Sequence, residues 1–194
     1  MADAGTIRAF LAVDPPPEVL ERIAAIQREL RKNVQGAIAW VRPEGIHLTI
    51  KFFGNIAPEL TETIAAEVRR SASGSASMSL EVRVLGVFPD LRRPRVIWIG
   101  LGGDVGPLGV LQKKIETGLE ACGFARETRP FRAHLTLARI KDGRGLVGLE
   151  PALRNPRLQE AGSFRVDELT LFRSELTPKG AVYTRLVTFP LEDG

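Results

Sequence analysis

The two histidines of this chain open nearly the same four-residue string. One string is His47-Leu48-Thr49-Ile50 and the other is His134-Leu135-Thr136-Leu137. Successive side chains of a β-strand point to opposite faces, so each string predicts a strand with histidine and threonine on one face and two apolar anchors on the other. The strings lie too far apart for one local element to hold both. A fold that uses them together must bring two distant strands side by side.

Two histidines and two threonines on one face suit phosphodiester chemistry. Cleavage needs a base to activate the nucleophile and an acid to protonate the departing oxygen, and imidazole does either near neutral pH. Threonine hydroxyls can donate hydrogen bonds to the phosphate oxygens. A single His-x-Thr string on a strand is usually structural, but two copies that contain every histidine of the chain favour one shared site.

Metal binding is the obvious rival use of two histidines. A zinc-type site needs three or four ligands, yet neither string has an acidic residue on its histidine face, and Cys122 is the single cysteine. The stretch Gly100–Gly109 lacks the Gly-Lys-Ser/Thr ending of a phosphate-binding P-loop. We therefore expect neither a metal nor a cofactor.

Hydrophobic periodicity and turn signals predict a mixture of grouped strands and helices. This order favours the α+β class with largely antiparallel sheets, rather than regular alternation of strand and helix. The expected strands are 6–13, 37–42, 46–53, 80–88, 96–101, 132–140, 164–173 and 181–188; the expected helices are 18–32, 58–71, 105–121 and a short one at 149–153. Residues 141–156 otherwise suggest a loop.

Composition adds weaker expectations. The 194 residues carry a formal net charge of +4, with a pI of about 9.6, which favours an anionic partner such as nucleic acid. No stretch approaches the ~20 apolar residues of a membrane span, and Met1–Gly5 does not begin a secretory signal. The lone cysteine is consistent with a reducing compartment. We expect a cytoplasmic protein without membrane contact.

Longer strings around the two motifs resemble a known family. The paired His-hydrophobic-Thr-hydrophobic motif is the signature of the two-histidine (2H) phosphoesterases. Four segments resemble one branch, the RNA 2′,3′-cyclic phosphodiesterases, also named 2′-5′ RNA ligases: Arg8–Val13, Trp40–Gly54, Arg129–Arg139 and Tyr183–Leu191. The resemblance covers nearly the whole chain and implies one domain, residues 1–194, with two lobes. Each lobe would have a mainly antiparallel sheet with outer helices, related by pseudo-two-fold symmetry around a cleft.

The resemblance also implies roles for particular residues. His47 would be the acid that protonates the leaving O3′, and His134 the base that activates water. Thr49, Thr136 and Arg139 would bind the phosphate. The substrate would be RNA with 2′,3′-cyclic phosphate ends, tRNA fragments among the possible sources, and the product a 2′-phosphate end. Reversal would give 2′-5′ ligation, and we expect a monomer.

Several questions stay open at this stage. Arg139 lies five residues after His134, so an ideal strand places it on the opposite face, and it reaches the site only if the strand ends or bulges first. Lys51 is in phase with His47 and could touch phosphate, and Phe52 or Phe53 could stack on a base. Alternative functions are a 2H enzyme for a small cyclic phosphate or a 2′-5′ oligonucleotide, and a non-catalytic RNA-binding module.

Overall fold

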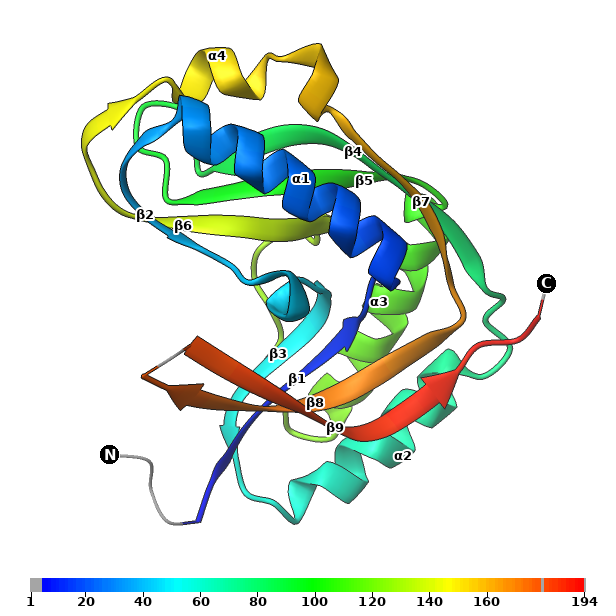
Figure 1. Cartoon of the computed structure of the whole chain (residues 1–194). Helices are drawn as coiled ribbons and strands as arrows, with labels where there is room; N and C mark the ends of the chain where they lie inside the picture. The colour runs from blue at the N-terminus through cyan, green and yellow to red at the C-terminus, as the bar shows by residue number, and fades with distance from the viewer. Residues whose placement is uncertain (1–4, 179, 194) are drawn as a thin grey trace.

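The computed structural model describes residues 5–178 and 180–193, which form one curled sheet with helices packed against it (Figure 1). Its strands are β1 (Ile7–Val13), β2 (Gln35–Trp40), β3 (Leu48–Ile56), β4 (Met78–Phe88), β5 (Val96–Gly103), β6 (His134–Val147), β7 (Glu160–Val166), β8 (Glu168–Thr177) and β9 (Gly180–Pro190). The helices are α1 (Pro17–Asn33), α2 (Leu60–Ala72), α3 (Val105–Ala121) and α4 (Leu149–Leu153), with short 3₁₀ turns η1 (Pro43–Gly45) and η2 (Pro156–Leu158).

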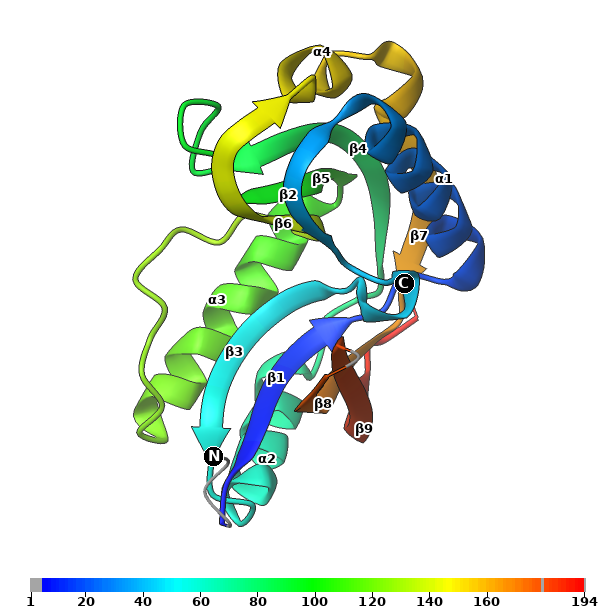
Figure 2. The ribbon, with the colours of Figure 1, turned by 60° about the vertical axis from the view of Figure 1, so that its left-hand side comes forward.

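The α+β class is confirmed, but the expectation of two sheets is wrong. One nine-stranded sheet has the order β7-β4-β5-β6-β3-β1-β8-β9, with β2 beside the later part of β6, and these strand pairs are all antiparallel. The two motif strands β3 and β6 pair only at Leu48 and Leu135. Figure 2 shows how the sheet curls on either side of this junction. This single pair joins β7-β4-β5-β6 to β3-β1-β8-β9 in one sheet.

Two further element boundaries differ from the sequence prediction. Strand β6 continues to Val147 through the region expected to be a loop, because β2 pairs with it as far as Val147. The expected strand 164–173 is two strands, β7 and β8, which join different strand groups: β7 pairs with β4, and β8 pairs with β1 and β9. Periodicity within a strand does not reveal its partner, so neither difference could be read from the local pattern.

Helix α1 is fixed to β6 through its buried face. Gln27 on that face is buried, and its amide Nε2 donates to the carbonyl oxygens of Val41 and Leu137, both at 2.9 Å. The amide therefore provides a hydrogen bond to two carbonyl oxygens, one just after β2 and one in β6. An apolar side chain at this position could not do so. The apolar part of the face consists of Val19, Ile23, Ile26 and Leu30.

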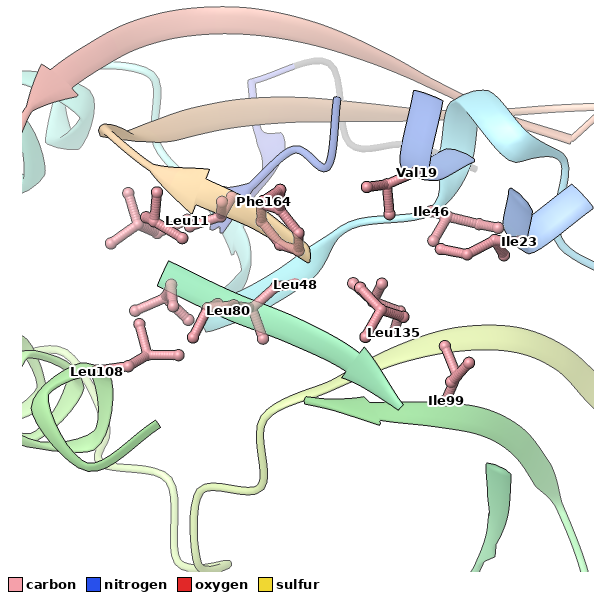
Figure 3. Close-up of a cluster of buried hydrophobic side chains, with 14 of the residues drawn as sticks. Leu11, Val19, Ile23, Ile46, Leu48, Leu80, Ile99, Leu108, Leu135 and Phe164 are labelled. Carbon is pink, nitrogen blue, oxygen red and sulfur yellow. The ribbon is translucent and has the colours of Figure 1, made fainter. Parts of the chain in front are cut away.

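The leucines of the two motifs lie in the centre of the core. Leu48 is 1% exposed and Leu135 is fully buried. Figure 3 shows both among side chains from β1, α1, β5 and β7. Full burial of a leucine contributes about 1.5–3 kcal/mol of hydrophobic stabilisation, so the two leucines hold the strands that present the histidines. No helix among the described residues is long and apolar enough to cross a membrane.

Candidate active site

The register of β3 and β6 brings the two motifs together on one face of the sheet, here called the histidine face and defined by His47, Thr49, His134 and Thr136. Leu48 is opposite Leu135 in an antiparallel pair. Continued by one residue, this register sets His47 beside Thr136 and Thr49 beside His134. The two histidines are then diagonal neighbours, a relation in which residues lie about 7–8 Å apart. Each imidazole thus has one threonine hydroxyl near it in its own motif and a second one on the neighbouring strand.

A β-bulge lies at the fourth residue of each histidine motif. Leu11 pairs with Lys51 but Ala12 with Thr49, so Ile50 has no partner in β1. Ile97 pairs with Ala138 but Trp98 with Thr136, so Leu137 has no partner in β5. An extra residue reverses the facing of all that follow it. Positions 52 and 139 therefore return to the histidine face, and position 51 leaves it.

Arg139 consequently lies near both histidines. Burial lowers the pKa of His47 and of His134, and the positive charge of Arg139 lowers both further. Burial raises the pKa of Tyr183, and Arg139 acts against that rise. Its side chain is exposed, as expected for a cation that could meet a bound anion. The bulge that sequence reasoning required for Arg139 to reach the site is present.

Lys51 does not lie on the histidine face. It is 4% exposed, and its ammonium Nζ donates to Glu116 Oε2 of α3 at 2.8 Å and to the carbonyl oxygen of Ala125 at 2.9 Å. The alternation that placed it in phase with His47 fails because the bulge at Ile50 intervenes. Phe52 takes the place on that face instead: it is 48% exposed, with the Arg8 guanidinium 4.5 Å from its ring centroid. Phe53 packs against Phe124 and the core.

Aromatic rings surround each imidazole. Phe10 stacks on His47 with centroids 4.6 Å apart, and Tyr183 meets His47 edge-on at 5.2 Å. Phe88 meets His134 edge-on at 4.9 Å, and Trp98 lies at 6.3 Å. Sequence reasoning did not identify these four residues as neighbours of the site. Of the four, Tyr183 had the clearest signal in the sequence. It is the one tyrosine of the chain, and it opens the segment that resembles the family's closing strand.

Each histidine ring also bonds to the backbone two residues before it. Nδ1 of His134 is 2.6 Å from the carbonyl oxygen of Arg132. Because a carbonyl only accepts, Nδ1 carries the hydrogen and Nε2 keeps a free lone pair. Burial lowers the pKa of His134, and this bond raises it in part. The carbonyl of Gly45 has the same relation to His47.

His47 is the more perturbed of the two rings. Burial lowers its pKa to about 4, with smaller lowering by Arg139 and His134, while Asp14 and the Gly45 carbonyl act in the opposite direction. Asp14 is held by Arg185, whose guanidinium donates to its carboxylate at 2.8 Å. In the free protein at neutral pH both rings are therefore neutral, and an arriving anion would raise the pKa of each.

The remaining groups of the site are the two threonines. Both are half-buried on the histidine face, and neither hydroxyl bonds to a protein group within residues 5–178 and 180–193. They are free to donate to a ligand. In the same ranges, no group of three or more His, Cys, Asp or Glu side chains is placed to hold a metal ion.

Comparison with known proteins gives consistent matches. The family model described as LigT-like phosphoesterase matches residues 13–98 and 104–183. An RNA 2′,3′-cyclic phosphodiesterase of Methanothermobacter thermautotrophicus is 35% identical over 185 residues, covering 95% of this chain and 99% of the relative. One from Aeropyrum pernix is 38% identical over 148 residues, covering 75% and 82%.

Solved structures agree with these sequence matches. A crystal structure of a Thermus thermophilus protein has a TM-score of 0.77 and 30% identity, covering 96% of this chain and 99% of that one. The crystal structure of Escherichia coli LigT complexed with 3′-AMP has a TM-score of 0.73 and 25% identity, covering 96% and 98%.

Proposed function

Because the chain belongs to the LigT-like phosphoesterase family, we propose that it hydrolyses the 2′,3′-cyclic phosphate at the end of an RNA strand to a 2′-phosphate. The observations that support the proposal are the pairing of Leu48 with Leu135, which brings the two motifs side by side, and the electrostatic effect of His134 on His47. This arrangement suits a single phosphate held between a proton donor and a proton acceptor. The full-length relatives named for this activity support the substrate class.

In the proposed reaction, water attacks phosphorus in line with the bond to O3′. His134 accepts a proton from that water through Nε2, the nitrogen left free by the bond of Nδ1 to Arg132. The P–O3′ bond breaks, and His47 donates its proton to O3′. Thr49 and Thr136 donate to the non-bridging oxygens, and Arg139 balances their charge. No metal ion takes part in this scheme.

The low pKa of His47 means that the substrate must help to protonate it. A phosphate anion beside the ring stabilises the imidazolium, and Asp14 acts in the same direction on His47 but is not among the charges that affect His134. This asymmetry favours His47 as the acid. Ligation of RNA ends through a 2′-5′ linkage would break the same P–O3′ bond with a 5′-hydroxyl in place of water, so the two histidines would keep the same roles.

The test uses His47→Ala and His134→Ala with a 2′,3′-cyclic nucleotide. Each change should lower turnover by roughly 10²–10⁴-fold, the usual contribution of one positioned acid or base. The double variant should lose less than the product of the two losses if the rings act as a unit. Circular dichroism checks that each variant is folded. The proposal fails if neither replacement slows hydrolysis.

Roles are assigned with a second substrate, a nitrophenyl phosphodiester, whose leaving oxygen needs no proton. The variant that lacks the acid should hydrolyse it well, and the variant that lacks the base should not. We expect rescue of His47→Ala. Rescue of His134→Ala instead would reverse the assignment and leave the reaction class unchanged.

A further inference from the structure

The connection between β4 and β5 carries a dense group of positive charge next to the histidine face. Arg92, Arg93 and Arg95 are exposed on this connection. In Figure 2 it is a green loop that projects from the body of the molecule. The loop begins directly after Phe88, whose ring lies 4.9 Å from that of His134. The arginines are thus only a few residues from the site.

The neighbouring part of β6 extends this charge. Val96, the first residue after the loop, pairs with Arg139, and the amide of Ile140 donates to the carbonyl oxygen of Arg95 at 2.9 Å. Lys141 and Arg144 follow and are exposed. Together these six cations form what we call the arginine strip: Arg92, Arg93, Arg95, Arg139, Lys141 and Arg144. A groove of about 310 Å³ lies between the loop and the last part of β6 and is lined by four of them, Arg92, Arg93, Arg95 and Arg144.

Carboxylates near the arginine strip do little to neutralise it. Asp90 accepts from the backbone amides of Arg92 and Arg93, at 2.8 and 3.0 Å, and so shapes the loop. Asp142 pairs with Arg144. Within the described ranges, the other five cations form no ion pair, whereas Arg154, Arg165, Arg173 and Arg185 each pair with carboxylates.

The arginine strip also accounts for the net charge of the chain. The sequence contains 27 Lys and Arg against 23 Asp and Glu. Setting aside the six cations and the two carboxylates of this region leaves equal numbers of each sign. The net charge of +4 is thus equal to that of the six cations and two carboxylates of this region.

We infer that the arginine strip binds the phosphate backbone of single-stranded RNA on its way to the histidines. The inference rests on the proposed function, which places the terminal phosphate between His47 and His134. The RNA continues from the O5′ of the terminal nucleotide, and its next phosphates reach the loop past Phe88. Arginine is suited to this because its planar guanidinium binds phosphate oxygens in pairs. The strip thus favours polynucleotides over mononucleotides without altering the chemical step.

The test compares two substrates in an Arg92→Ala/Arg93→Ala variant. One is a 2′,3′-cyclic mononucleotide, and the other is an oligoribonucleotide of about eight nucleotides with a 2′,3′-cyclic end, a length typical of single-strand binding surfaces. We expect KM for the oligonucleotide to rise at least about fivefold at low salt, with kcat unchanged. Both constants for the mononucleotide should be unaffected. The slope of log KM against log salt should flatten by about 1.4, because each lost single-strand phosphate contact removes about 0.7.

The matched control is Lys113→Ala/Lys114→Ala. It removes the same charge from exposed positions on α3, the helix that packs on the face opposite the histidines. The inference is overturned if this control raises KM for the oligonucleotide as much as the loop variant does, or if the loop variant behaves as wild type.

Fluorescence anisotropy with a labelled, uncleavable single-stranded RNA separates the inference from the proposed function. Weaker binding by the loop variant than by the control supports the arginine strip even if no cyclic phosphate is hydrolysed. Hydrolysis of the mononucleotide together with equal RNA affinity in all three proteins supports the reaction and rejects the strip.

Discussion

At the scale of single residues, the two histidines share a local setting. Each ring is largely withdrawn from water, each approaches the carbonyl two residues earlier in the chain, and each has an aromatic ring within 5 Å. The carbonyl and the aromatic ring fix the orientation of the imidazole. Burial keeps the imidazole neutral until a negatively charged ligand binds. They differ in Asp14, which acts on His47, and this difference is what can give two similar residues opposite roles.

The low pKa of His47 predicts an acid-sensitive fold. In the unfolded chain this ring binds a proton below about pH 6.5, but in the folded protein only below about 4. The unfolded state therefore holds more protons between these values, and stability falls as pH falls through that window, by up to about 1.4 kcal/mol per pH unit.

The measurement is urea unfolding of wild type and His47→Gln from pH 7 to 4. The variant should show a shallower decline of the unfolding free energy over this range, because it lacks the group that gains the proton. Carboxylates titrate in both proteins and cancel in the comparison. Parallel curves would show that His47 titrates normally in the folded protein.

At the scale of elements, the paired bulges decide which side chains the site contains. Without the extra residue at Ile50, Lys51 would face the histidines and Phe52 the core; without the one at Leu137, Arg139 would be turned away. Each bulge residue is the fourth residue of its motif. The motif therefore specifies a local backbone shape as well as two polar side chains.

The buried pair of Lys51 and Glu116 connects β3 to α3, and its loss should affect stability rather than chemistry. Lys51→Met leaves a carboxylate buried without its cation and should lower the unfolding free energy by about 3–5 kcal/mol. Lys51→Met/Glu116→Leu removes both charges and should recover most of that loss. The values are measured by denaturant unfolding.

An exposed pair supplies the comparison. Glu29→Gln breaks the ion pair with Lys32, whose side chains are 48% and 69% exposed, and should cost no more than about 0.5 kcal/mol. Both Lys51 variants should retain wild-type kcat per folded molecule. A large fall in kcat in a normally folded Lys51 variant would show that Lys51 contributes to the reaction.

These elements also show how far the sequence could be interpreted. The strands of both motifs, the short helix at 149–153 and the α+β class followed from periodicity and turn residues, which act locally. The bulges depend on the partner strand, so the face of Lys51 could not be predicted and that of Arg139 had to stay conditional. The aromatic neighbours of the histidines come from β1, β4, β5 and β9, whose pairing only the tertiary fold determines.

At the scale of the whole molecule, the site draws its reactive groups from two strands and needs no further ligand in the proposed reaction. We therefore expect hydrolysis of a 2′,3′-cyclic nucleotide to survive dialysis against excess chelator, since two histidines without additional ligands do not hold a catalytic ion. A metal-dependent phosphodiesterase treated in parallel verifies the chelation. Activity lost on chelation and restored by a divalent metal would contradict the acid–base scheme.

The order of strands around His47 has a consequence for how the protein is made. Strands β1 and β3 come from the first third of the chain, but β1 is covered by β8, and Tyr183 of β9 contacts the His47 ring. During synthesis, β1 and β3 leave the ribosome more than a hundred residues before β8 and β9, which pack beside them. The strands around His134, namely β4, β5 and β6, are complete earlier and can already fold. A prematurely terminated chain that ends before residue 168 lacks one wall of the site. The surroundings of His47 are therefore completed only after β8 and β9 have been synthesised, later than those of His134.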